Sequence, residues 1–266
     1  MTVVGRAVEP PDRSSGLAAQ PVAGWRAALA LAGMELRLTL RRGENLLVTL
    51  VIPAVVLVFF ATVSVLPAPD GRAVDFLLPG SLALAVIATS MVSLGIATGY
   101  ERSYGVLKRL GGAPLSGSSL VAAKILAVLV VELVQAALLV GMAVALLGWR
   151  PPVGSSLPAL VAALLLGSAA FGGLGLLMAG RLRAEATLAI ANGLFLAFLL
   201  LGGIVIPATS LPDALASLAA LLPAGALADA FRAALGGDAD LARALITLLA
   251  WGGITAGLAV RTFRWE

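Results

Sequence analysis

The residues with the most chemical information lie between two long hydrophobic segments, from Glu101 to Ser116. On a helix at about 100° per residue, the charged side chains of this stretch fall within an arc of roughly 120°, and the apolar ones within roughly 160° of the opposite side. The charged set is Glu101, Arg102, Lys108 and Arg109, and the apolar set is Tyr104, Val106, Leu107 and Leu110. Gly111 and Gly112 end a helix readily, and Pro114 prevents its continuation. The pattern predicts one short amphipathic helix.

Such a helix is suited to binding another protein. Its charged side chains can fix orientation and partner choice, while Tyr104, Leu107 and Leu110 provide apolar contact. The alternative is a helix that lies on the inner membrane surface with its basic residues on anionic lipid. Glu101 on the polar face disfavours that alternative, because an acidic side chain is repelled by such lipids.

A second group of candidates lies inside the hydrophobic segments. Glu132 is an ionisable residue within the third of them, where a charge is costly, so it is a candidate to bind a cationic drug or relay a proton. A structural role is the alternative, with Glu132 hydrogen-bonded to Gln135 or to a neighbouring subunit. Thr89, Ser93 and Asn192 are candidate pathway residues, and helix packing is the alternative for each of them.

Composition excludes several kinds of chemistry. The chain has no cysteine and no histidine, which removes disulfides, thiolate nucleophiles, histidine bases and the usual zinc ligands. No GxxxxGK[ST] phosphate loop occurs, so we expect no ATP binding, no cofactor and no enzyme activity in this chain. The formal charge of +4 comes from basic residues at the ends of apolar segments rather than from clusters, and this predicts no nucleic-acid partner.

The elements that must position these residues are membrane helices. With 60% hydrophobic and 12% charged residues and a mean hydropathy of +1.04, the 266-residue chain belongs in a lipid bilayer. Uncharged runs long enough to span it predict six transmembrane helices in an all-α integral membrane protein. The runs are Leu46 to Leu66, Phe76 to Tyr100, the segment between Lys124 and Arg150, Leu157 to Gly180, Ala186 to Ile206, and the segment from Leu241 to Arg261.

The N-terminal region precedes these spans. Residues 1–24 carry prolines and scattered charges without apolar periodicity, which predicts a disordered cytoplasmic leader. Trp25 to Arg42 has an apolar face and predicts a helix in the membrane interface, the alternative being a cytoplasmic helix packed on protein. Arginine and lysine concentrate at alternate ends of the spans, so both termini and the Glu101–Ser116 stretch are expected in the cytoplasm. Lys124 is expected on the same side, extending to the headgroups.

Prolines break the region after the fifth span. Pro207, Pro212 and Pro223 leave two short apolar pieces, Asp213 to Leu222 and Ala224 to Leu235, neither of which can cross a bilayer. We expect a re-entrant pair of half-helices that dips into the outer leaflet, which requires protein or water around its ends. Two amphipathic helices lying on the outer surface are the alternative.

The order of these features resembles the permease subunits of the type-2 ATP-binding-cassette (ABC) export family. The resemblance rests on Glu101-Arg102-x-x-Gly105-x-Leu107-Lys108-Arg109-Leu110-x-x-x-Pro114-Leu115-Ser116 and on Gly202-Gly203-Ile204-Val205-Ile206-Pro207 with its later Leu-Pro pairs. It departs at Ser103, where a third charge is common, and at Val106, where threonine is common. Drug and natural-product efflux permeases, of the daunorubicin-resistance type, look like the nearest branch. Residues 25–266 would form the permease domain.

The resemblance implies a function and partners. The helix after the second span would be a coupling helix, seated on a cytoplasmic ATPase subunit present in two copies, which would bind ATP and magnesium. A second permease copy or a paralogue would complete the path, lined by the second and fifth spans, and the half-helix pair would form its outer gate. The expected substrate is a hydrophobic or amphipathic antibiotic or natural product, exported across a bacterial plasma membrane. The alternatives are a lipid or polysaccharide exporter of the same family, an ion-coupled carrier using Glu132, and a membrane scaffold without transport.

Overall fold

The computed structural model describes residues 24–41, 43–63, 72–111, 117–205, 212, 214–215, 219 and 221–262, and its regular elements there are all helices. The prediction of an all-α membrane protein is confirmed. In chain order the helices are α1 (Gly24–Arg41), α2 (Gly43–Thr62), α3 (Ala73–Val86), the π-helix η1 (Ile87–Ser93), α4 (Leu94–Ser103), α5 (Val106–Gly111), α6 (Gly117–Leu147), α7 (Leu157–Arg181), α8 (Ala184–Leu201), α10 (Pro223–Ala234) and α11 (Leu241–Thr262). The predicted leader lies outside the described residues, except for Gly24.

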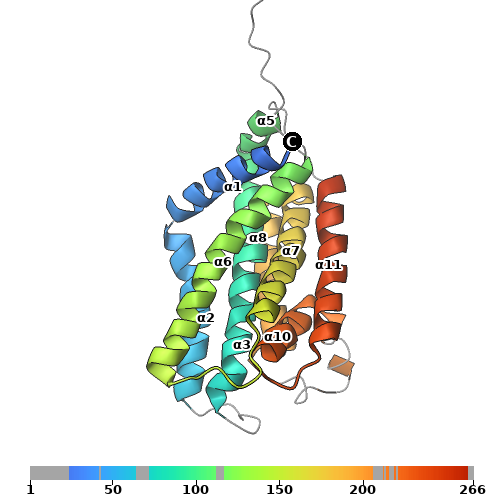
Figure 1. Ribbon diagram of the computed structural model, residues 1–266. Coiled ribbons are helices and arrows are strands. Elements are labelled where there is room, and N and C mark those ends of the chain that lie inside the picture. The colour runs from blue at the N-terminus through green and yellow to red at the C-terminus, as the bar shows by residue number, and fades with distance from the viewer. Residues whose placement is uncertain are drawn as a thin grey trace, which may run out of the picture.

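Five helical segments of the described chain are long and apolar enough to cross a membrane. They are the continuous α3–η1–α4 segment (Ala73–Ser103), α6, α7, α8 and α11. The apolar part of α2 that the structure describes, Leu47–Thr62, is shorter than these five segments. Helix α2 nevertheless packs beside α3 and α6 and runs along the bundle with them (Figure 1). The sixth span therefore stays a prediction.

The two ends of the bundle differ. Figure 1 shows α1 and α5 together at one end, the end at which α11 also finishes, while α10 lies at the opposite end. Helix α1 packs on α6 across its end of the bundle, with Ala28, Leu31 and Ala32 buried. Trp25 and Leu29 of α1 are exposed, at 62% and 53%. One face of α1 is thus packed on protein, and apolar side chains on the rest are free to meet lipid, so the helix combines features of both alternatives.

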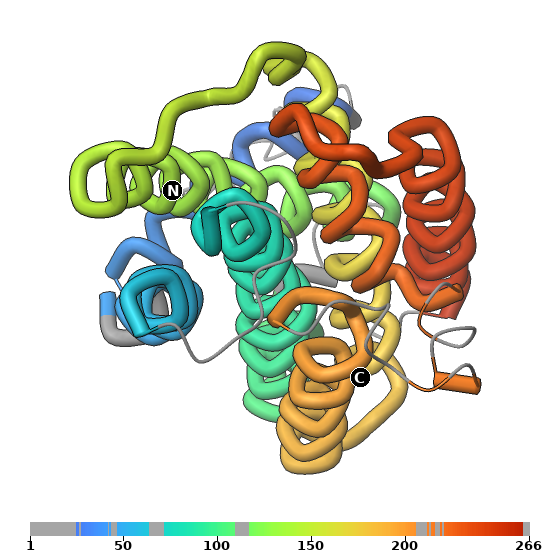
Figure 2. The backbone as a smooth tube through the Cα atoms, turned by 90° about the horizontal axis from the view of Figure 1, so that it is seen from below, coloured from blue at the N-terminus to red at the C-terminus, as the bar shows by residue number. Residues whose placement is uncertain are grey.

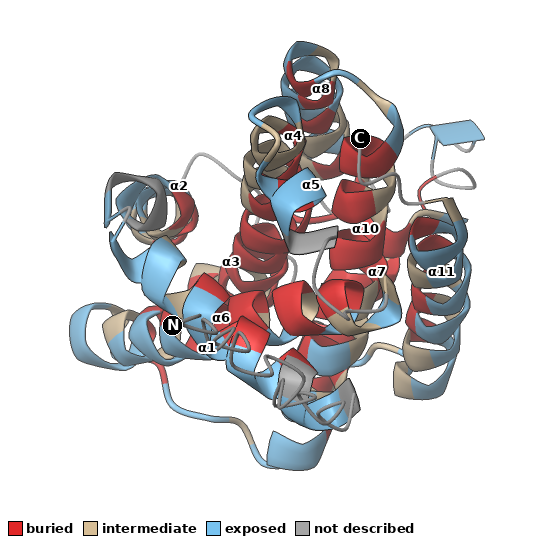
Figure 3. Ribbon diagram, turned by 90° about the horizontal axis from the view of Figure 1, so that it is seen from above, coloured by how far each residue is buried: buried red, intermediate tan, exposed pale blue. Residues whose placement is uncertain are grey.

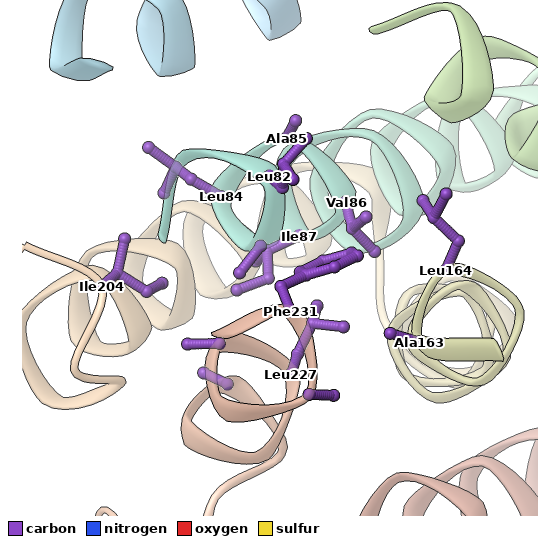
Figure 4. Packing of buried hydrophobic residues seen from close by; sticks show 14 of the residues in the cluster. Leu82, Leu84, Ala85, Val86, Ile87, Ala163, Leu164, Ile204, Leu227 and Phe231 are labelled. Atoms are coloured by element: carbon purple, nitrogen blue, oxygen red, sulfur yellow. The ribbon is translucent and has the colours of Figure 1, made fainter. Parts of the chain in front are cut away.

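The second predicted half-helix is α10, and it is embedded in protein. It packs against α3, α7 and α11, among which it lies when the molecule is viewed from that end (Figure 2). Phe231 and Leu227 point from α10 toward Val86 and Ile87 (Figure 4), and both are fully buried. This burial favours the inserted half-helix over a helix lying on the surface. The first half-helix, Asp213 to Leu222, lies mostly outside the described residues.

Glycines permit the closest helix approaches in the core. A Cβ atom on Gly173 of α7 would lie 2.5 Å from Thr255 Oγ1 of α11, and one on Gly95 of α4 would lie 3.1 Å from the Gly175 backbone. The first GxxxG pattern, Gly95 to Gly99, therefore packs within the chain. A second GxxxG pattern, formed by Gly253 and Gly257 of α11, differs, because both glycines are exposed and a Cβ atom on either would meet nothing within 4 Å.

Candidate functional site

The Glu101–Leu110 stretch is not one helix, and that prediction is wrong. Helix α4 ends at Ser103, Gly105 has a φ of 69°, and α5 begins at Val106. This left-handed backbone conformation is accessible at low cost to glycine, so Gly105 turns the chain sharply before α5. From the sequence, Gly111 was expected to end the helix, and the earlier turn at Gly105 was not expected. We call Tyr104 to Arg109 the α4–α5 corner.

The α4–α5 corner exposes some of its predicted binding residues and buries others. Tyr104 is 74% exposed and Val106 41%, and Lys108 and Arg109 are exposed as well. Leu107 is fully buried in a small apolar cluster with residues of α1 and α6 (Leu31, Ala32, Leu120 and Ala123). The Leu110 side chain lies outside the described residues. Leu107 thus anchors the corner to the bundle instead of presenting a surface.

Glu101 and Arg102, in the last turn of α4, are occupied by contacts within the chain. The Arg102 guanidinium donates a hydrogen bond to the Leu182 carbonyl at 2.5 Å, next to the start of α8. Glu101 accepts a hydrogen bond from Lys124 Nζ at 2.7 Å. Both residues therefore position the end of α4. The outward-facing residues of the corner are then Tyr104, Val106, Lys108 and Arg109.

Lys124 joins three helices in a buried ionic triad. Besides Glu101 of α4 it binds Glu35 of α1, with 2.9 Å between Nζ and Oε1. The lysine is 1% exposed, so the prediction that it extends to the lipid headgroups is wrong. Buried charges persist when they are paired and hydrogen-bonded, and removing one partner leaves the others at high cost. The triad therefore fixes α1, α4 and α6 to one another directly beneath the α4–α5 corner.

The intramembrane carboxyl group is held by two serines. Glu132 is 1% exposed, and its carboxylate oxygens accept hydrogen bonds from Ser90 of η1 and Ser168 of α7. The partner expected from the sequence, Gln135, is engaged elsewhere: its side chain accepts from Thr89 and donates to Thr49, both at 2.9 Å. Ser168 is separated from Glu132 by 36 residues, and no local spacing could have indicated this pair.

The π-helix explains how neighbouring residues 89 and 90 both reach α6. An i to i+5 hydrogen-bonding pattern widens the helix locally, and such segments are frequent at functional sites. Here η1 directs Thr89 to Gln135 and Ser90 to Glu132, two buried polar contacts on one face of α6. The arrangement supports the packing alternative for Thr89 and Glu132.

Glu132→Gln is accordingly expected to fold and to retain transport, because the amide oxygen can accept from one serine while the amide nitrogen donates to the other, whose hydroxyl can rotate to accept. Glu132→Leu removes both acceptors and is expected to lower thermal stability by the equivalent of about 0.6 to 2 kcal/mol. Melting of both variants in one detergent, with activity measured in lipid, checks this. A stable Glu132→Gln protein without transport would instead assign the carboxyl group a part in transport.

Ser93 and Asn192 lie in a different environment, a lateral groove of about 760 Å³ between α2, the η1–α4 segment and α8. Helices α2 and α8 lie on either side of α4 (Figure 3). The described residues lining the groove are mostly apolar, with Glu101, Tyr100 and Tyr104 at the end next to the α4–α5 corner. Thr89 and Glu132 are not among them. The four intramembrane candidates thus divide into two groove residues and two buried ones.

Together these features describe a multi-pass, all-α membrane protein with an outward-facing corner at one end and a lateral groove leading away from it. A family model described as ABC-2 type transporter matches residues 26–235, and the chain belongs to that family of ABC transporter permeases. It is a membrane transport component and not a catalytic domain. None of the curated proteins compared with the chain matches it.

Proposed function

We propose that this permease works in an exporter driven by two copies of a separate cytoplasmic ATPase, which binds the ATP and magnesium. Two permease units, identical or paralogous, enclose the path, and the substrate is a hydrophobic or amphipathic small molecule such as an antibiotic or natural product. Both termini and the α4–α5 corner face the cytoplasm of a bacterial cell, since the basic residues concentrate at that end.

The α4–α5 corner is the observation that supports this proposal, because it is exposed and is packed on the bundle through the buried Leu107. Tyr104 and Val106 offer apolar surface beside the charges of Lys108 and Arg109. Buried aromatic anchors within a charged rim are typical of protein interfaces. Leu107 and the Lys124 triad beneath the corner would transmit a push from the ATPase to the bundle without local collapse.

The corner is connected to the groove through the η1–α4 helical segment, which lines the groove. Helix α4 carries Tyr100 and Glu101 at its cytoplasmic end, directly before Tyr104 of the corner. Ser93 and Ile96 line the groove further along the same continuous helical segment. A rotation of this segment, produced at the corner, would change the groove's shape along its length. This is how ATP binding in the partner would be converted into displacement of substrate.

The lining chemistry favours an amphipathic substrate over the alternatives. Val48, Ile52, Val92 and Phe195 provide apolar surface, which suits drugs and lipids better than polysaccharides. An ion-coupled carrier would need Glu132 on the substrate path, and Glu132 is buried with Ser90 and Ser168 away from the described groove lining.

Co-purification of the chain with a candidate ATPase, followed by ATP-hydrolysis measurements across antibiotics and lipids, tests the proposal. We expect a stable complex whose hydrolysis is stimulated by a subset of amphipathic compounds. Transport that collapses with the proton gradient and continues with a hydrolysis-deficient ATPase would overturn it.

A further inference from the structure

We propose that the inner end of the lateral groove is a binding site for an amphipathic cation, with Glu101 as its charged contact and Tyr100 and Tyr104 as its aromatic contacts. The proposal rests on the export function above and narrows its substrate class. It concerns only described residues, all of them on α2, the η1–α4 segment, the α4–α5 corner and α8.

The ionic triad next to this end of the groove has a net negative charge. Glu35 and Glu101 share a single ammonium group, that of Lys124, so the ionised triad carries one uncompensated negative charge. Of its three members, only Glu101 lines the groove, and it is the single charged residue among the described lining residues. One oxygen of Glu101 accepts from Lys124, while the Glu101 side chain as a whole remains 14% exposed. A cation in the groove would meet this carboxylate without meeting the ammonium group.

Two stacked tyrosines flank the carboxylate. The rings of Tyr100 and Tyr104 have centroids 6.1 Å apart and planes 26° apart; Tyr100 directly precedes Glu101 in the sequence and Tyr104 follows it by three residues. Aromatic faces attract organic cations, and the attraction grows where water is excluded. Tyr104 is 74% exposed, so its ring is available both to a ligand in the groove and to surface contacts of the corner.

The rest of the groove suits the apolar part of such a ligand. The volume of about 760 Å³ lies within the range of small-molecule sites. The lining from Ala88 to Tyr104 follows about 24 Å of helix at 1.5 Å per residue. Along it, Val92, Ile96 and Phe195 supply apolar contact, and Ser93 and Asn192 supply isolated polar groups. A bulky apolar body with one positive charge at the corner end matches this distribution.

A pair of probe ions similar in size and opposite in charge tests the proposal directly. Tetraphenylphosphonium and tetraphenylborate are measured by equilibrium dialysis against the full-length permease in nanodiscs, with empty nanodiscs of the same lipid as the blank. No ATPase is present, so binding is separated from coupling. We expect protein-specific binding of tetraphenylphosphonium at least tenfold tighter than that of tetraphenylborate.

Matched variants locate the site. Glu101→Gln is expected to weaken tetraphenylphosphonium binding about tenfold, whereas Glu185→Gln, an equal charge change on an exposed residue of α8 outside the groove lining, leaves it unchanged. Tyr104→Phe retains binding and Tyr104→Leu weakens it. If Glu101→Gln fails to fold, two other results still test the site. They are the comparison of the two ions on the unmodified protein and the comparison of Tyr104→Phe with Tyr104→Leu.

Equal binding of the two ions, or equal losses in Glu101→Gln and Glu185→Gln, would overturn the proposal. The two ions could bind equally while neutral compounds stimulate ATP hydrolysis by the permease–ATPase complex. That result would contradict the cation site and leave the export function supported. Selective cation binding without any ATPase association would support the cation site and contradict the ATP-driven export function.

Discussion

Lys124→Met is expected to lower the free energy of unfolding by about 3 to 5 kcal/mol, the typical cost of removing one partner of a buried ion pair. The reason is specific to this triad: the substitution leaves Glu35 and Glu101 facing each other across a site where Lys124 was 1% exposed. Two carboxylates would then remain without a counter-charge, and α1 and α4 would lose their common attachment to α6. Thermal and denaturant unfolding in one detergent measure the effect.

Two controls separate the triad from a general loss of positive charge. Arg109→Met removes an exposed charge of the α4–α5 corner and is expected to change stability by about 0.5 kcal/mol or less. Combining Lys124→Met with Glu35→Gln and Glu101→Gln removes all three charges and is expected to recover most of the loss. If Lys124→Met were as stable as the Arg109→Met control, the triad would not hold these helices together.

Leu107→Ala is expected to cost about 2 to 5 kcal/mol, as for other fully buried leucines. Its side chain fills the cluster formed with Leu31, Leu120 and Ala123, so truncation leaves a cavity between α5, α1 and α6. Tyr104→Ala, only three residues earlier, is expected to change stability by about 0.5 kcal/mol or less, because Tyr104 is 74% exposed. The same unfolding measurements apply to both variants.

The contrast between these two neighbours tests the placement of the α4–α5 corner. A continuous amphipathic helix would give both residues the same outward face and similar, small effects on stability. Similar effects at Leu107 and Tyr104 would therefore contradict the turn at Gly105 and restore the single-helix interpretation.

Much of the architecture is predictable because it depends on local chemistry. Uncharged runs of about 20 residues report membrane helices directly, since the bilayer thickness sets their length. Pro223 likewise marked the start of α10, because proline is tolerated at the first turn of a helix but not in its interior. The family resemblance rested on two motifs, each contiguous in the sequence, and the match over residues 26–235 confirms the family.

The contacts that define the candidate site are not local, and the sequence did not reveal them. Lys124 reaches Glu35 across 89 residues, and Glu132 reaches Ser90 across 42 residues, through a π-helix that hydropathy does not reveal. Residues that look alike on a helical wheel then separate in three dimensions: Leu107 turns inward while Tyr104 turns outward, because a single glycine changes the backbone direction. Gly105 belongs to the motif on which the resemblance rests. A glycine at that position was the signal in the sequence that could have indicated a left-handed turn.

The central claim is that the α4–α5 corner is where the ATPase binds, and the affinity of a purified partner ATPase for the permease in nanodiscs tests it most directly. Tyr104→Asp places a charge at the exposed centre of the corner and is expected to weaken binding at least about 30-fold, as for an interface hot spot of 2 kcal/mol, while the permease stays folded. Glu185→Gln is expected to leave binding unchanged. Unaltered ATPase affinity in a folded Tyr104→Asp protein would contradict the account.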